Sequence, residues 1–194
     1  MAWRLVILGP PASGKGTQGV RLAIQLGVPH ISAGHLLRAS VEEDGDPFGI
    51  QRLVDQGRMV PDEVVQETLS RSLGPGFILD GYPRTAVQAR WLDGVLQGLG
   101  LPLHAALELD VDEEILEARM GLRAKQEKRS DDRPEVFHRR LLDYRRSVSG
   151  LRAHYAGRLV EVDGTGSEEE VLARLLSRLP SPHSGPRPHP AGHG

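Results

Sequence analysis

The chain has 194 residues, enough for one domain with a sizeable core and fewer than two ordinary domains need. Asp and Glu outnumber Lys and Arg by 26 to 24, so no global field would draw the protein to nucleic acid or to an anionic membrane. The absence of cysteine excludes disulfides, thiolate zinc sites and a cysteine nucleophile, and it fits a reducing compartment. No apolar run approaches the ~20 residues that span a bilayer, so we expect a cytoplasmic protein without a membrane segment.

Short apolar runs bounded by turn residues alternate with amphipathic patterns along the chain. The runs 3–8, 76–80, 105–109 and 158–162 predict strands that are buried on both faces. Apolar residues recur at helical spacing over 85–99 and 135–151, and Ser167 with Glu170 forms a capping-box pattern that starts a last helix. This alternation predicts an α/β fold with a mostly parallel sheet, in which ligands bind at the carboxyl ends of the strands.

Two segments do not follow this alternation. Residues 124–132 are polar and charged without periodicity, so we expect a mobile loop between two helices. Residues 180–194 are rich in Pro, Gly, Ser and His and predict a disordered tail. The tail contains His183, His189 and His193, but their irregular spacing favours plain disorder over a metal-binding segment.

The segment GPPASGKGTQ, residues 9–18, follows the first predicted strand. Gly9, Gly14 and Lys15 have the spacing of a P-loop, in which backbone N–H groups between a strand and a helix surround a phosphate. The helix that begins near Lys15 directs its positive dipole at the same point, and Lys15 adds a full charge. The residue after the lysine is Gly16, and the hydroxyl comes one position later, at Thr17. The sequence therefore predicts a phosphate-binding loop in which the hydroxyl residue stands one position later than usual.

The variant GKGTQ, residues 14–18, is similar to the nucleoside monophosphate kinases, and among them to the adenylate kinases. Further segments carry the resemblance: ISAGHLLR at 31–38, GRMVPDE at 57–63, GFILDGYPR at 76–84 followed by Gln88, Arg119, Arg123, RSDD at 129–132, and Arg140. The resemblance implies a three-layer P-loop fold over residues 1–179 with a five-stranded sheet. It also implies a helical monophosphate-binding insertion at about 32–61, a short lid at about 124–132 and a monomer. The implied reaction transfers the γ-phosphoryl group of Mg–ATP to AMP.

The resemblance also implies roles for individual residues. The ATP-binding residues would be Ala12, Ser13, Gly14, Lys15, Gly16, Thr17, Arg119, Arg123 and Gly166. The AMP-binding residues would be Ala33, Arg38, Arg58, Met59, Val60, Gly81, Tyr82, Pro83, Arg84, Gln88, Arg129 and Arg140. The catalytic residues would be Lys15, Arg84, Arg123, Arg129 and Arg140. Asp80 would bind Mg²⁺ through water.

These residue types suit phosphoryl transfer. The planar fork of an arginine, as at Arg38 and Arg84, matches a phosphate better than a lysine does. The transition state is loose, with charge spread over the phosphoryl oxygens, so arginines, a lysine and Mg²⁺ matter more than a general base. The acceptor is already a phosphate anion, which agrees with the lack of a His–Asp or Ser–His pair in the motifs. Asp80 has a simpler interpretation as the cap of a turn, but the neighbouring P-loop favours the metal.

Two further interpretations stay open at this point. Thr85 and Gln88 form a capping-box pattern, so the Gln88 amide either closes the start of the helix or binds the base of the monophosphate; we favour the base. Arg119 and Arg123 are spaced i, i+4 and lie on one helix face, which would be a solvated basic face in the absence of the other motifs.

The pattern departs from the resemblance at Ala33 and at His35. Adenylate kinases usually have threonine in place of Ala33, and SAG at 32–34 is closer to the uridylate/cytidylate kinases, so we expect AMP to be preferred with some turnover of CMP or UMP. His35 stands where the family has a carboxylate. It either slows catalysis, since Arg38 lies on the same turn, or is a tolerated surface change. The alternatives are therefore a broader monophosphate kinase or a nucleotide-binding protein with impaired catalysis.

Overall fold

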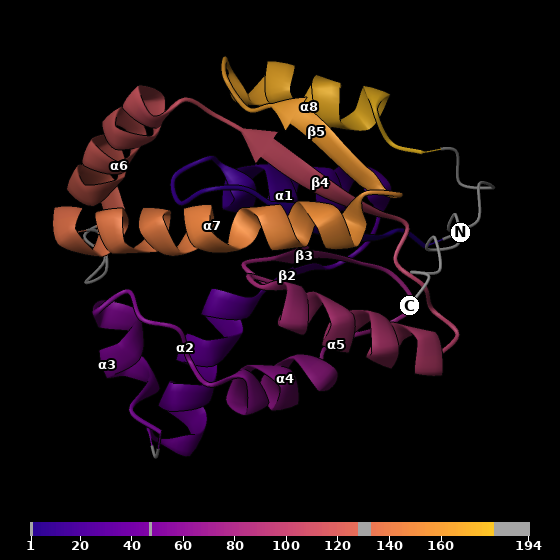
Figure 1. Ribbon diagram of the computed structural model, residues 1–194, viewed down its shortest axis with the longest axis horizontal. Helices are drawn as coiled ribbons and strands as arrows, with labels where there is room; N and C mark the ends of the chain where they lie inside the picture. Colours follow the sequence, from indigo (N-terminus) through magenta and orange to yellow (C-terminus); the bar gives the residue numbers. More distant parts are fainter. Residues whose placement is uncertain (1, 47, 128–132, 181–194) are drawn as a thin grey trace.

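The computed structural model describes residues 2–46, 48–127 and 133–180, and it is built on a parallel sheet in the order β2–β3–β1–β4–β5 (Figure 1). The strands are β1 Arg4–Leu8, β2 His30–Ser32, β3 Phe77–Asp80, β4 Ala105–Asp110 and β5 Leu159–Asp163. The helices are α1 Lys15–Leu26, α2 Ala33–Asp44, α3 Ile50–Asp55, α4 Asp62–Ser70, α5 Ala86–Gly98, α6 Glu113–Glu127, α7 Pro134–Tyr155 and α8 Glu168–Ser177. The predicted α/β fold with a five-stranded sheet is confirmed.

The alternation of side chains along β1 produces two core layers. Leu5 and Ile7 pack with residues of α1 and α8 on one face of the sheet. Val6 and Leu8 pack on the other face with residues of α2–α5 and α7. Because side-chain direction has a period of two along a strand, a strand that is apolar at every position needs helices on both faces. The three layers therefore follow directly from the sequence of β1.

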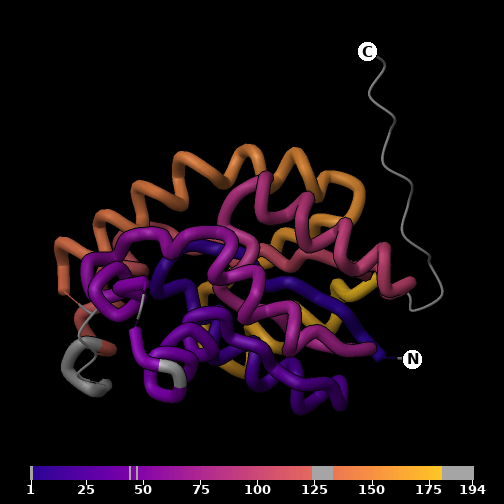
Figure 2. The backbone as a smooth tube through the Cα atoms, turned by 90° about the horizontal axis from the view of Figure 1, so that it is seen from below, coloured from indigo at the N-terminus to yellow at the C-terminus, as the bar shows by residue number. Residues whose placement is uncertain are grey.

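Helices α2, α3 and α4 stand between β2 and β3 in the chain. They lie below the sheet in Figure 1, on the face that α5 and α7 cover. Two capping interactions fix where α2 and α3 begin. The Ser32 hydroxyl accepts a hydrogen bond from the His35 N–H at 3.4 Å, and the Asp46 carboxylate accepts from the N–H groups of Ile50 and Gln51. Figures 1 and 2 both place α3 beside the start of α7.

Most predicted boundaries agree with the structure to within a few residues. At α8, Ser167 and Glu170 form the reciprocal capping box that their spacing predicts. The sequence pattern does not predict strand β2, because it has only three residues and polar ends. Helix α6 continues to Glu127, so helical backbone occupies the start of the segment predicted as a loop; its last residues, AKQE, include no helix breaker. Residues 128–132 and 181–194, on which the rest of the lid and tail predictions fall, lie outside the described residues.

Arg4 and His104 join the amino ends of the sheet strands. The Arg4 guanidinium, on a residue only 7% exposed, donates to the carbonyls of Pro75 and Pro102. The Arg4 backbone N–H donates to His104 Nδ1 at 3.0 Å, so this nitrogen must keep its lone pair. Burial lowers the pKa of His104, and the Arg4 guanidinium lowers it further. Protonation would remove an acceptor and place a second cation beside Arg4.

We expect the free energy of unfolding to decrease as the pH falls below about 6.5, because the unfolded chain then binds protons that the native His104 resists. His30, whose pKa burial also lowers, contributes in the same pH window. The variant His104→Asn keeps an acceptor near the position of Nδ1 but does not titrate, so its stability should depend less steeply on pH. Urea denaturation at several pH values checks this, and a slope equal to that of the wild type would contradict it.

Candidate active site

The loop between β1 and α1 has the backbone that its glycines predict. Gly9 and Gly14 have φ values of 142° and 93°, and Ala12 has a φ of 63°. A Cβ on Gly9 would lie 2.9 Å from the carbonyl oxygen of Leu109, so the chain passes too close to β4 for any other residue. Gly14 is the N-cap of α1, and no side chain caps this helix. The first N–H groups of α1 are therefore available to an anion.

Lys15 is held over this loop. Its ammonium donates to the carbonyl oxygen of Pro10 at 2.6 Å and lies 3.4 Å from the Ser13 hydroxyl. Burial is the main cause that lowers the pKa of Lys15 to about 8. Asp80 opposes this shift, and three further cations add to it, namely Arg84, Arg123 and Arg140. Four cations from four separate parts of the chain thus face one loop.

A cavity of about 960 Å³ lies above the carboxyl ends of the strands. Its wall includes the P-loop, the end of β3, and residues of α6, α7 and the segment before α8. The predicted site residues that line it are Ala12, Ser13, Gly14, Lys15, Gly16, Thr17, Arg38, Met59, Asp80, Gly81, Pro83, Arg84, Arg119, Arg123, Arg140 and Gly166. The structure therefore brings together most of the residues predicted for the two nucleotides, although they are spread over more than 150 positions.

Two arginines of the cavity are held by backbone carbonyls. Arg119 donates to Ser13 at 3.3 Å and to Gly164 at 2.9 Å, so it ties the P-loop to the segment after β5. Arg84 donates through Nε to Gly81 at 3.0 Å, and its Nη1 lies 3.9 Å from the sulfur of Met59. Arg119 is therefore part of the cavity wall and not of a solvated basic face.

The Asp80 carboxylate extends from the end of β3 to the start of α1. A Cβ on Gly16 would lie 3.6 Å from Asp80 Oδ2, so the glycine that follows Lys15 leaves this carboxylate close to the helix backbone. Within the part of the chain that the structure describes, no three His, Asp or Glu side chains form a cluster that could hold a metal ion. A lone carboxylate suits Mg²⁺, which keeps several waters and takes its other ligands from substrate phosphates.

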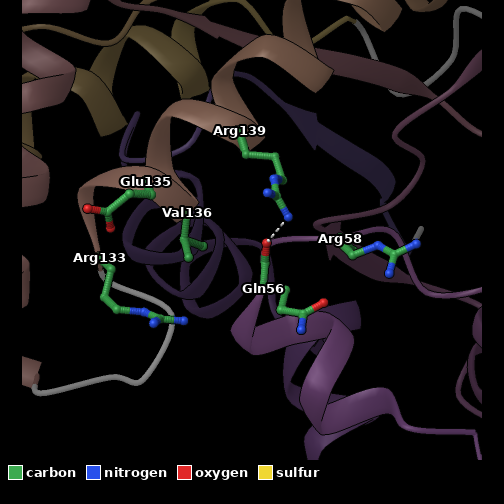
Figure 3. Close-up of a pocket in the computed structure, with 6 residues that line it drawn as sticks. All are labelled: Gln56, Arg58, Arg133, Glu135, Val136 and Arg139. Carbon is green, nitrogen blue, oxygen red and sulfur yellow. Dashed lines mark hydrogen bonds between the residues drawn. The ribbon is translucent and has the colours of Figure 1, made fainter.

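Other predicted residues do not line this cavity. Ala33, Val60, Tyr82 and Gln88 are buried behind its wall. Arg58 lines a separate cavity of about 580 Å³ between α3 and α7 (Figure 3). Arg129 lies outside the described residues. His35 is exposed and is not part of the described cavity wall.

The Gln88 side chain is 1% exposed and bridges two segments. Its Oε1 accepts from the Arg84 N–H at 2.6 Å, and its Nε2 donates to Asp62 Oδ1 at 2.7 Å. The Thr85 hydroxyl accepts from the Gln88 N–H at 3.2 Å, which is one half of a capping box. In the other half of a capping box, the Gln88 side chain would accept from the Thr85 N–H. Here it accepts instead from the N–H of Arg84, one residue earlier. Each end of the amide keeps one further hydrogen-bonding position, but this buried side chain must become accessible before a base can use it.

A buried network that the sequence analysis missed holds α7 against β4. Glu108 is 1% exposed; it accepts from the Tyr144 hydroxyl at 2.5 Å and from Arg152 Nε at 2.8 Å. Tyr144 also lines the large cavity. The sequence feature that indicates such a network is the glutamate within the apolar strand β4, because charged side chains are seldom fully buried unless they are paired. Through this network α7 presents Arg140 to the P-loop.

Comparison with known proteins agrees with this site. A sequence model of the family described as adenylate kinase matches residues 7–159. The chain is 46% identical over 185 residues to the adenylate kinase of Xanthomonas campestris pv. campestris (strain B100) and 43% identical to that of Stenotrophomonas maltophilia (strain R551-3). Both comparisons cover 91% of this chain and 98% of the relative. These matches confirm the resemblance that the motifs predict: the chain belongs to the adenylate kinase family.

Proposed function

We propose that the protein transfers the γ-phosphoryl group of Mg–ATP to AMP and thereby forms two ADP. The observation that carries this proposal is the group of cations around the P-loop, consisting of Lys15, Arg84, Arg123 and Arg140. Burial is the main cause of the lowered pKa of Lys15, and repulsion from the three arginines adds to it. A polyanion such as the phosphates of two nucleotides would turn the repulsion into attraction.

Each residue then has a defined part in the reaction. The N–H groups at the start of α1 and the Lys15 ammonium hold the β- and γ-phosphates of ATP. The forks of Arg38 and Arg84 hold the phosphate of AMP, one oxygen of which attacks the γ-phosphorus. The bond from that phosphorus to the β–γ bridging oxygen breaks, and ADP leaves with this oxygen. No general base is needed, because the attacking oxygen is already anionic.

Three arginines would neutralise the charge that spreads over the transferred group, namely Arg123, Arg129 and Arg140. Asp80 would hold Mg²⁺ through water, since a single carboxylate at this position fits the preferences of that ion. When bound, Mg²⁺ supplies positive charge to the β- and γ-phosphate oxygens. Arg119 and Gly166, which both line the cavity, would contact the rest of ATP.

We assign the monophosphate to the side of the cavity formed by residues 32–61 and the lid to residues 124–132. Arg38 and Met59, from the first of these segments, support the assignment because both line the cavity. No helix of the described residues is long and apolar enough to cross a membrane. We further propose that the protein acts as a monomer in the cytoplasm, where its two nucleotide substrates are available.

A broader choice of acceptor is the second candidate. Ala33 is 2% exposed, and a Cβ on Gly81, which lines the cavity, would lie 3.9 Å from the Ala33 Cβ. The methyl group of Ala33 therefore sits directly behind the monophosphate side of the wall. It offers no hydrogen bond with which to distinguish one base from another, so CMP and UMP would be rejected less strongly.

Replacing Lys15 tests the proposed function directly. We expect Lys15→Ala to lower kcat/KM for AMP phosphorylation by roughly 10²–10³-fold, because a preorganised charge on the transferring group is lost. Formation of ADP from Mg–ATP and AMP measures this. Arg21→Ala is the matched control: Arg21 lies on the same helix, where it pairs with Glu168 and Glu169, and its loss should leave the rate within about twofold. Full activity of Lys15→Ala would rule the proposal out.

The pKa of Lys15 predicts a pH dependence of nucleotide affinity. The charged form binds phosphate, so the affinity of the free protein for ATP should decline as the pH rises above about 8. In Lys15→Arg the cation does not titrate, and this decline should disappear. Calorimetric titration with Mg–ATP between about pH 7 and pH 9.5 would measure both proteins. Identical pH profiles would show that Lys15 is not the titrating group.

Residue 33 should set the acceptor range. We expect measurable turnover of CMP or UMP by the wild type, and we expect Ala33→Thr to favour AMP over these pyrimidines by about a further tenfold through its hydroxyl. Ala33→Val is the control, because valine has the shape of threonine without the hydroxyl and should not produce this gain. The measurement is kcat/KM for the three monophosphates, and a wild type without pyrimidine turnover would contradict the prediction.

A further inference from the structure

Helix α3 ends at the cavity wall in a motif closed by glycine. The Gly57 N–H donates to the Val54 carbonyl at 2.9 Å, and the Arg58 N–H donates to the Leu53 carbonyl at 2.8 Å. Gly57 has a φ of +66°, so the pair of bonds is a Schellman motif. This closure satisfies the carbonyls of Leu53 and Val54 and leaves the next two carbonyls pointing beyond the helix.

Those two carbonyls accept hydrogen bonds from the start of α7. Arg133 donates to the Asp55 carbonyl at 2.8 Å, and Arg139 donates to the Gln56 carbonyl at 2.9 Å. Figure 3 shows the second bond as a dashed line between Arg139 and Gln56, with Arg133 on the other side of Val136. A guanidinium at the end of a helix also interacts favourably with the helix dipole. We refer to Arg133 and Arg139 together as the arginine clamp.

The backbones of the two segments also approach closely. A Cβ on Gly57 would lie 2.8 Å from Val136 Cγ1 and 3.2 Å from the Val136 carbonyl oxygen, so glycine is needed here for space as well as for its φ. In addition, Arg140 donates to the Val54 carbonyl at 3.2 Å. The end of α3 is thus fixed to the first turns of α7 by hydrogen bonds and by direct packing.

This junction sets the position of one wall of the active site. Val54, Gly57 and Met59 line the large cavity, and the Met59 sulfur lies 3.9 Å from the guanidinium of Arg84. The arginine clamp itself does not line that cavity but a neighbouring one of about 580 Å³. Its influence on a bound monophosphate must therefore pass through the turn at residues 56–59.

We propose that Arg133 and Arg139 are positioning residues for AMP, an inference that rests on the proposed function. They keep the turn at the end of α3 in the arrangement that receives the monophosphate. When the competent arrangement is populated for only a fraction of the time, the apparent dissociation constant rises by the inverse of that fraction. Loss of the arginine clamp should therefore weaken the binding of AMP and leave the ATP side, built on the P-loop and Arg119, unchanged.

A merely structural role predicts a different result. Both clamp residues are exposed, and their hydrogen bonds form at the surface. Surface bonds of this kind contribute little to the free energy of unfolding. The arginine clamp should thus affect affinity for one substrate much more than it affects the melting temperature.

The first experiment compares Arg133→Ala, Arg139→Ala and the double variant with the wild type. We expect KM for AMP to rise roughly three- to tenfold in the double variant, KM for ATP to stay within about twofold, and Tm to change by no more than about 2 °C. Arg139→Lys, which keeps the charge but not the fork, should restore part of the affinity for AMP. The control is Arg71→Ala, an exposed arginine of α4's C-cap that pairs with Glu67 and should leave both KM values unchanged.

The second experiment separates the contact with α7 from backbone strain. Gly27 ends α1 with a φ of +65° and has no atom within 4 Å of an added Cβ, whereas Gly57 has nearly the same φ and contacts Val136. Both Gly→Ala variants incur the strain of a left-handed alanine. Only Gly57→Ala should also displace the turn from α7 and raise KM for AMP.

Two readouts keep the inference distinct from the proposed function. Calorimetric titration with AMP needs no turnover, and amide hydrogen exchange over residues 50–59 reports how firmly α3 is held. Weaker AMP binding and faster exchange in the double clamp variant support the inference even if the wild type fails to transfer phosphate. Unchanged AMP affinity in the double variant, an equal loss of affinity for both nucleotides, or a raised kcat with unchanged KM for AMP would overturn it.

Discussion

The burial of the Lys15 ammonium beside three arginines is the constraint on which the rest of the site depends. A charge cluster of this kind does not assemble by itself, because the desolvated ammonium already has a pKa of about 8. The favourable free energy comes from elsewhere, from the two core layers that meet at β1, whose side chains are buried on both faces of the sheet. The hydrophobic core thus holds a loop and its cations in an arrangement that a bound anion would stabilise further.

Helix α7 connects the P-loop side of the cavity with the side formed by the end of α3. In its second half, Tyr144 and Arg152 are fixed to the buried carboxylate of Glu108, and at its start the helix is fixed to the end of α3. Arg140 lies between these two attachments and faces the P-loop. One helix of 22 residues therefore sets the distance between Arg140 and the turn at the end of α3. A small shift at either attachment of α7 would therefore also move Arg140, because packed helices deform little.

The sequence predicted the parts of this arrangement whose signals are local. The P-loop, the apolar strands and the capping box at Ser167 each lie within a few residues, and the structure has all of them. The attachments of α7 could not be predicted, because they join residues about 40 to 80 positions apart and nothing in a single sequence pairs them. For Gln88 the sequence indicated an internal cap or a base contact, and the structure shows a third arrangement, a bridge to Asp62.

That bridge has a consequence for the selection of the base. The Gln88 amide has one partner at each end and is buried, so a nucleotide base would use its remaining lone pair or N–H hydrogen only after the segments around it open. Such an opening offsets part of the free energy that the new hydrogen bond contributes. Discrimination between bases would then depend more on neighbouring polar groups. A hydroxyl at position 33 would be one of these, and this chain has the methyl group of Ala33 in its place. Under the proposed assignment, the base pocket therefore lacks a polar group at position 33.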